Sequence, residues 1–297
     1  MNGFFNIWKP AGMSSAAVVA VIRRLTGEKR TGHAGTLDPE AAGVLPIMTG
    51  KATRLFDYLV DKEKEYEAVC AFGTSTDTQD FTGKVLETGD RYPDLETVRE
   101  RAKALTGEIR QKPSAYSAIK VGGQPLYARA RKGETVDVPE RTVMIHSIEV
   151  TGEEPDHGVA RRVRCGKGTY IRTLCHDLGK KCGCPAHMRS LLRTRSGVFR
   201  LDTALTLEDA RALASEGKLA ERMLAPDYPL GHLQMVDVPS KFAKQVAAGA
   251  KIPADFLGEA LPPETENLRL YLNGAFWGIV RREGNMLVWR AQIAPET

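Results

Sequence analysis

The 297-residue sequence lacks any run of about eighteen apolar residues, so it predicts no membrane-spanning helix. The opening segment MNGFFNIWKP has no long apolar stretch either, and we expect no signal peptide. Internal repeats and low-complexity tracts are also absent, while 42% of the residues are hydrophobic, enough for a sizeable core. These features argue against a membrane protein, a repeat protein or a disordered chain, and they predict a cytoplasmic globular protein with no membrane association.

Cysteine is scarce, and its number is odd. The five cysteines are unevenly spaced, which favours reduced thiols in a cytosolic protein over a disulfide framework. Cys175, Cys182 and Cys184 lie near His176 and His187, so a zinc site has to be considered. Their C-x6-C-x-C spacing lacks the C-x2-C pairs of structural zinc sites, and we therefore expect no metal.

Basic residues are concentrated in one stretch, although the whole chain is only mildly basic, with a net charge of +5. Residues 161–200 hold eleven Lys and Arg residues against one acid, Asp177, so their net charge is +10 and the rest of the chain carries −5. This concentration favours a polyanionic partner such as a nucleic acid. An ordinary solvated charged face would have the same composition and stays an alternative.

The stretch Gly32–Leu55 gathers more special residue types than any other, including a histidine, a lone aspartate before proline and several glycines. Asp38 has two possible roles. It is either the N-cap of a helix, followed by proline and glutamate, or a residue of an active site. A phosphate-binding P-loop does not fit. Six residues rather than four separate Gly43 from Gly50, and Ala52 stands where a P-loop has the Ser or Thr that binds magnesium.

The segment HAGTLDPEAAGVLPIMTGKATR resembles the signature of the TruB family of tRNA pseudouridine synthases. Three further segments support the resemblance: Lys9-Pro10, the KPSAYSAIK run and following basic segment at 112–133, and the K-G-T-Y-I-R motif that ends at Arg172. Together they cover residues 1 to about 225 in order. The resemblance implies that Asp38 is the catalytic aspartate.

The same resemblance implies roles for four residues elsewhere in the chain. Tyr66 would stack under the target base, and Arg172 would pair with the catalytic aspartate. Tyr170 would lie in the active site, and Leu191 would pack at the base pocket. From the residue pattern alone, Tyr66 and Leu191 read as core positions, and Tyr170 and Arg172 as the start of a helix with a surface arginine.

We also expect a group of residues that binds the RNA outside the base pocket. The ring of His33 is suited to fill the gap left by a flipped base, although a structural histidine is the alternative. Lys9, Lys51 and Arg54 would hold the phosphate backbone.

The resemblance implies an α+β pseudouridine synthase fold, with a mixed, mostly antiparallel sheet flanked by helices. We expect a catalytic domain at 1–228 and a small β-rich module at 229–297, which resembles a shortened PUA-type RNA-binding module. Periodicity and turn residues predict the elements. The first predicted helix is at 16–26, with Ser14 or Ser15 as its cap and Gly27 as its stop. Further predicted helices are at 95–106, from about 171 to 182 with Ile171, Leu174 and Leu178 inward, and at 239–249, and Thr206 caps one more. The predicted strands are 64–73, 142–151, 159–165, 186–199, 267–272, 275–282 and 286–293, and 74–83 is a polar loop. Alternate residues of the first strand, from Tyr66 to Phe72, should point one way, and Asn273-Gly274 predicts a hairpin turn.

The expected function is isomerisation of uridine to pseudouridine at position 55, in the T-loop of tRNA, by base flipping and an aspartate-dependent exchange of the C–N for a C–C glycosidic bond. No cofactor is needed, because no electrons or groups are gained. We expect a monomer that binds the T-arm without an obligate protein partner. The alternatives are a non-catalytic RNA-binding protein or tRNA-folding chaperone on the same fold, and a glycosylase, which would release the free base.

Overall fold

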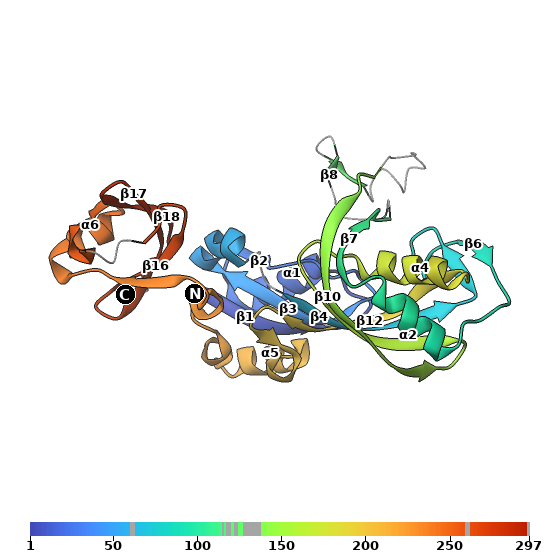
Figure 1. The fold of residues 1–297 in the computed structure, drawn as a ribbon. Coiled ribbons are helices and arrows are strands. Elements are labelled where there is room, and N and C mark those ends of the chain that lie inside the picture. Colours follow the sequence, from blue (N-terminus) through green and yellow to red (C-terminus); the bar gives the residue numbers. More distant parts are fainter. Residues whose placement is uncertain are drawn as a thin grey trace. The chain divides into compact units, whose positions relative to one another are not determined.

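The computed structural model describes residues 1–59, 63–114, 116, 120–121, 124–126, 138–258 and 262–295 (Figure 1). The chain divides into two compact units. Unit 1 comprises residues 1–39, 44–60 and 197–297, and unit 2 comprises residues 40–43 and 61–196. The predicted boundary at 228/229 stays a prediction.

Two strands of unit 1 are buried on both faces, because apolar residues occupy successive positions. Strand β1 (Gly3–Lys9) pairs with β3 (Ala42–Thr49), which also pairs with β2 (Thr31–His33). Phe4 packs into one hydrophobic cluster, whereas Phe5 and Ile7 pack into another. Successive side chains of a strand point to opposite faces, so each face of β1 has its own core.

Two helices cover the Phe5 face: α1 (Ser15–Thr26) and α5 (Leu207–Ser215). Helix α1 begins at the predicted position because Ser14 caps it, accepting a hydrogen bond from the Ala17 N–H at 3.1 Å. It ends at Gly27, whose left-handed φ of 66° closes the helix. Thr206 caps α5 in the predicted way, accepting from the Asp209 N–H at 3.0 Å.

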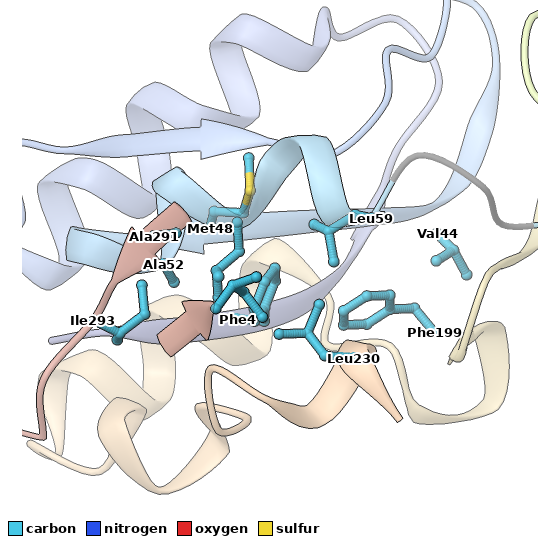
Figure 2. Packing of buried hydrophobic residues seen from close by; sticks show 11 residues of the cluster. Phe4, Val44, Met48, Ala52, Leu59, Phe199, Leu230, Ala291 and Ile293 are labelled. Carbon is cyan, nitrogen blue, oxygen red and sulfur yellow. The ribbon is translucent and has the colours of Figure 1, made fainter. Parts of the chain in front are cut away.

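The Phe4 face of β1 packs against segments from both ends of the sequence (Figure 2). The 3₁₀ helix η1 (Gly50–Leu59) contributes Ala52 and Leu55. The C-terminal strands contribute Ala291 and Ile279 to the same cluster. The last residues of the stretch Gly32–Leu55 are therefore held by the C-terminal end of the chain.

The C-terminal part of unit 1 is β-rich, as predicted. Its five-stranded sheet has the order β14 (Gln234–Asp237), β16 (Asn267–Leu272), β17 (Ala275–Glu283), β18 (Met286–Gln292) and β15 (Ile252–Pro253). Asn273 and Gly274 have φ values of 53° and 76° and form the predicted hairpin turn. The short strands β14 and β15 were not predicted. The predicted helix at 239–249 is a 3₁₀ turn, η5 (Ser240–Phe242), followed by α6 (Ala243–Ala248).

Unit 2 is built on an antiparallel sheet. Its order is β12 (Ala186–Ser196), β4 (Lys64–Phe72), β11 (Gly158–Cys165), β10 (Arg141–Glu154) and β7 (Gly107–Gln111). Gly43 pairs in parallel with Arg193 of β12. It has a φ of 110°, and a Cβ at this position would collide with the Arg193 carbonyl oxygen, so the pairing requires glycine.

Helices α2 (Leu95–Lys103) and α4 (Ile171–Cys182) pack against this sheet. Ile171, Leu174 and Leu178 of α4 are buried as predicted. On β4, the alternate residues from Tyr66 to Phe72 are buried, also as predicted. The Cys70 thiol donates to the Cys175 carbonyl, so this face of β4 is the one that α4 covers.

Three expectations differ from the structure or lie outside it. The segment at 74–83 is not entirely loop, since β5 (Thr74–Thr76) pairs with β6 (Val85–Thr88). The helix predicted at 95–106 ends at Lys103. Most of 112–133 lies outside the described residues, where only the short strands β8 (Lys120–Val121) and β9 (Gln124–Pro125) are defined. Within the described ranges, every helix is too short or too polar to cross a membrane.

Candidate active site

Asp38 does not begin a helix. The chain turns at residues 39–40 and enters β3 at Ala42, so the N-cap interpretation is wrong. An aspartate followed by proline suits a turn as well as a helix start. The pairing of Ala42 and the buried run that follows select the extended backbone here.

The backbone before Asp38 is held by a buried serine. Ser15 lies at the start of α1 and is 3% exposed. Its Oγ accepts from the Leu37 N–H at 2.9 Å and donates to the Leu37 carbonyl at 3.0 Å. The Leu37 side chain is itself buried, with 4% exposure. The residue before Asp38 is thus fixed by a reciprocal pair of hydrogen bonds and by packing.

The backbone after Asp38 is held by a buried lysine. The Lys9 Nζ donates to the carbonyl oxygens of Pro39 at 2.9 Å, Pro10 at 2.8 Å and Met13 at 2.5 Å. Three carbonyls match the three donors of an ammonium group. Two buried polar side chains from distant segments therefore hold the peptide units on both sides of Asp38, and the Asp38 side chain is half-buried.

This geometry corrects our expectation for Lys9. Its side chain is fully buried, with 0% exposure, so in this conformation it does not present its charge to an RNA phosphate. The sequence predicted a phosphate contact because lysines usually lie at the surface. The three carbonyls that bind it come from turns whose approach the sequence does not reveal. Lys9 instead positions the Asp38 segment.

The other candidate RNA-binding residues of unit 1 lie within about sixteen positions of Asp38 in the sequence. His33 ends β2, lies opposite Ile47 of β3 and is half-buried. Lys51 is half-buried in η1, and Arg54 is exposed, with Nη1 donating to the Gln292 carbonyl at 3.1 Å. Their RNA contacts stay predictions.

In unit 2, the K-G-T-Y-I-R motif forms the start of α4. Tyr170 is the N-cap residue but makes no side-chain cap, and Arg172 lies in the first turn. Arg172 is 4% exposed. It donates to the carbonyls of Thr78 at 2.9 Å and Tyr116 at 3.0 Å, and it forms an ion pair with Asp80 at 3.4 Å. The surface-arginine interpretation is therefore wrong.

Asp80 is a residue that the sequence analysis missed. It is 9% exposed, and its Oδ1 accepts hydrogen bonds from the hydroxyl of Thr78 at 2.7 Å and from the hydroxyl and N–H of Thr82 at 2.6 and 3.0 Å. A carboxylate held by this many donors has a fixed position and orients the Arg172 guanidinium. The available signal was the T-D-T-Q-D spacing within the segment interpreted as a polar loop.

Tyr66 and Leu191 lie on the same face of the sheet. Tyr66 of β4 is opposite Arg193 of β12, and Leu191 is opposite Ala68, two positions along the same pair of strands. Tyr66 is 6% exposed, whereas Leu191 is only half-buried and is not the core residue its pattern suggested. Both residues lie on the face that α4 covers. The predicted pair of Asp38 and Arg172 joins one residue of each unit and stays a prediction.

The basic stretch at 161–200 is largely neutralised within the protein. Three of its eleven basic residues are buried: Arg161, Arg172 and Arg193. Five lie within ion-pair distance of a carboxylate: Arg162, Arg164, Arg189, Arg195 and Arg200. The remaining three are exposed lysines: Lys167, Lys180 and Lys181. The charge count alone therefore overstated the case for a polyanionic partner, because the acids come from elsewhere in the sequence.

One carboxylate gathers several of these cations. Glu63 contacts Arg164 at 3.0 Å and Arg195 at 2.8 Å, and hydrogen bonds from these two guanidinium groups lower the pKa of Glu63. Burial lowers the pKa of the adjacent Lys64, with the Arg193 charge as a further cause. These cations are therefore part of an ion-pair network around Glu63, and each exposed pair in it is worth little in stability.

The described residues contain no group of three or more His, Cys, Asp or Glu side chains arranged to hold a metal ion. The five cysteines are free thiols. Burial raises the pKa of Cys165 and of Cys182 to about 11, so both stay protonated at neutral pH.

Two family models match the chain in succession. The TruB family pseudouridylate synthase N-terminal domain matches residues 23–171, and the tRNA pseudouridylate synthase B C-terminal domain matches residues 172–229. The chain belongs to the TruB family of tRNA pseudouridine synthases.

Curated relatives match this TruB-family chain over most of its length. A tRNA pseudouridine synthase B of Alkaliphilus oremlandii is 43% identical over 286 residues, covering 95% of this chain and 94% of the relative. A tRNA pseudouridine synthase B of Bacillus licheniformis is 46% identical over 255 residues, covering 84% of this chain and 82% of the relative. This TruB-family chain is accordingly an enzyme that isomerises uridine to pseudouridine in tRNA, and the non-catalytic alternative receives no support.

Solved structures show the same fold. Cbf5 in a complex with Nop10 and Gar1 is 28% identical, with a TM-score of 0.70, over 94% of this TruB-family chain and 78% of that chain. A chain of an H/ACA ribonucleoprotein bound to a substrate RNA containing 2′-deoxyuridine is 25% identical, with a TM-score of 0.73, over 99% and 85%. The predicted fold class is thereby confirmed.

Proposed function

We propose that this TruB-family enzyme isomerises the uridine at position 55, in the T-loop of tRNA, with Asp38 as the catalytic carboxylate. The observation that carries the proposal is the fixation of the backbone on both sides of Asp38 by Ser15 and Lys9. Catalysis requires a reacting group held in one geometry, and contacts to the flanking peptide units supply this without neutralising the carboxylate.

The reaction breaks the N1–C1′ bond, turns the base and forms a C5–C1′ bond, so a proton leaves C5, N1 gains a proton, and the composition is unchanged. An ionised carboxylate in a dry pocket could attack the base, bond to C1′ or remove a proton from C2′. Asp38 is the carboxylate in this role, and no cofactor takes part. Arg172 pairs with Asp38 and orients it, while Asp80 holds Arg172 in position.

The target base leaves its stack before the reaction. Tyr66 provides an aromatic face for the flipped base, and its hydroxyl assists the late removal of the C5 proton. Tyr170 and Leu191 complete the pocket, and the position of Leu191 on the same sheet face as Tyr66 supports the grouping of these two residues. His33 fills the space that the base leaves in the RNA.

The RNA backbone is held by Lys51 and Arg54. The β-rich region at 229–297 acts as a PUA-like RNA-binding module that grips the T-arm. We infer a cytoplasmic monomer that needs no protein partner, although the similar Cbf5 structure is a complex with Nop10 and Gar1.

An unmodified tRNA transcript incubated with the purified protein alone tests this function. Pseudouridine is mapped by carbodiimide labelling and primer extension, with Asp38→Asn as the matched control. We expect a single stop in the T-loop that is absent with the variant. Stops elsewhere would refute position 55, and tight binding without any stop would favour an RNA-binding protein without activity on this transcript.

A further inference from the structure

Two residues that face each other across a pair of strands both contact Tyr170. Gln111 ends β7 and Arg141 begins β10, and the two are direct partners in the antiparallel register. Directly opposite residues place their side chains on the same face of a sheet. The active-site candidate Tyr170 is therefore contacted by two residues that no sequence motif indicated.

Gln111 fixes the backbone of Tyr170. The Tyr170 N–H donates to Gln111 Oε1 at 3.0 Å, and Gln111 Nε2 donates to the Tyr170 carbonyl at 3.3 Å. Gln111 is completely buried, so water does not compete for these hydrogen bonds. The same loop is tied to β10 by the Gly166 N–H, which donates to the Met144 carbonyl at 2.8 Å.

Arg141 lies over the ring of Tyr170, with the guanidinium carbon 5.5 Å from the ring centroid. Arg141 is half-buried, and its buried Nε has no hydrogen-bond acceptor among the described residues. Its neighbour across the strands behaves differently, since the exposed Arg110 pairs with Glu140 at 2.6 Å. Arg141 has no carboxylate partner in the part of the chain that the structure describes.

This arrangement leaves a charge to be compensated. A guanidinium stays protonated in proteins, and its stacking on an aromatic ring recovers only about 0.5–2 kcal/mol. A partly buried cation without an anion is costly. The substrate of this enzyme carries one phosphate per nucleotide, and the arginine fork matches phosphate oxygens. Gly168 lies beside Nη1, since a Cβ at this position would be 3.8 Å from it, in ordinary van der Waals contact.

We propose that Arg141 binds a phosphate of the RNA strand beside the uridine that is isomerised. Phosphate binding then fixes the guanidinium above the Tyr170 ring, while Gln111 holds the backbone of the same residue. The inference rests on the proposed function, because it requires Tyr170 to lie where the target nucleotide binds. Arg141 is a substrate-binding residue in this scheme, and Gln111 is a positioning residue.

The test measures the affinity of an unmodified tRNA transcript for wild type, Arg141→Ala, Arg141→Lys and Arg110→Ala at several salt concentrations. Loss of one phosphate contact should reduce the slope of log affinity against log salt by about 0.7, with about tenfold weaker binding near 0.1 M salt. We expect this for Arg141→Ala. Arg141→Lys should keep the slope but bind less tightly than wild type, because lysine lacks the planar fork. Arg110→Ala removes a charge from the opposite strand and should change neither quantity by more than about twofold.

Two results would overturn the proposal. An unchanged slope for Arg141→Ala, with slower turnover or a lower Tm, would mean that Arg141 only packs against Tyr170. Equal slope losses in Arg141→Ala and Arg110→Ala would mean that any cation here acts through the general field. If Arg141→Ala does not fold, Arg141→Gln replaces it, and the slopes of the Gln and Lys variants are compared.

The wild-type assay separates this inference from the proposed function. Pseudouridine formation by wild type, with an unaffected slope in Arg141→Ala, refutes only the phosphate contact. If wild type forms no pseudouridine, the proposed function fails, and the salt slope still decides whether Arg141 binds phosphate.

Discussion

Two segments of the molecule hold their key residue in different ways. Around Asp38 in unit 1, Ser15 and Lys9 bind the backbone of the neighbouring residues. Around Arg172 in unit 2, the carboxylate of Asp80 forms an ion pair with the guanidinium itself, and two carbonyls add hydrogen bonds.

The contacts around Asp38 act on the position of its backbone, whereas the contacts around Arg172 act on the charge of its side chain. Hydrogen bonds to flanking peptide units fix where the backbone of Asp38 lies, and these bonds do not use its carboxylate. The ion pair with Asp80 fixes the position of Arg172 and also partly compensates its charge. This compensation is needed because the attraction between two buried ions offsets the cost of their desolvation. Substitutions on each side of the comparison should therefore change different quantities.

The largest effect is expected from Asp38→Asn. The substitution removes the ionised carboxylate and few RNA contacts, so turnover should fall by at least about three orders of magnitude, with tRNA affinity within about tenfold of wild type. Single-turnover rates and filter binding measure the two quantities. Multiple turnovers by a clean preparation of the variant would rule out Asp38 as the catalytic residue.

Asp80→Asn should have the next largest effect. The Arg172 guanidinium then loses the Asp80 carboxylate but keeps its carbonyl partners, so we expect kcat to fall by about 10- to 100-fold and KM to change little. A double-mutant cycle with Arg172→Ala is the decisive measurement. Additive losses would show that Asp80 does not act through Arg172.

Lys9→Met tests the backbone side of the comparison. Three carbonyls lose their donor, and the free energy of unfolding should fall by about 2–4 kcal/mol, with a roughly tenfold slower turnover. Because Lys9 is buried, the salt dependence of tRNA binding should stay that of wild type. A slope reduced by about 0.7 would instead restore Lys9 as a phosphate contact.

The smallest effect is expected from Glu63→Gln in the neutralised basic stretch. The pKa of Glu63 is lowered in the folded state, so its contribution to stability is present above its ordinary value of 4.5 and is lost as the pH falls through the lowered value. Glu63 is partly exposed, so solvent screening keeps the contribution below about 1 kcal/mol at pH 7. Denaturant melts of both proteins at pH 7 and pH 3 check this. A stability difference that is larger at pH 3 would contradict the assigned sign.

The contrast between α1 and the Asp38 turn shows where sequence patterns succeed. Ser14 and Gly27 are helix signals that act within one turn of chain, and α1 begins and ends where they predict. Asp38 followed by proline is an equally good local signal, but the pairing of Ala42 with β12 overrides it. Local signals are reliable only where no tertiary contact competes with them.

The sequence by itself determined the family, the helices and strands with clear periodicity, the Asn273-Gly274 hairpin and most of the candidate residues. Only the tertiary structure decided that Lys9 is buried, that Asp80 orients Arg172, and that the arginines of 161–200 are mostly paired. The physical reason is distance along the chain. Lys9 and Pro39 are 30 positions apart, and Arg172 and Thr78 are 94 apart. Periodicity and caps encode neighbours within a few residues, whereas burial and charge compensation depend on which distant segments the fold brings together.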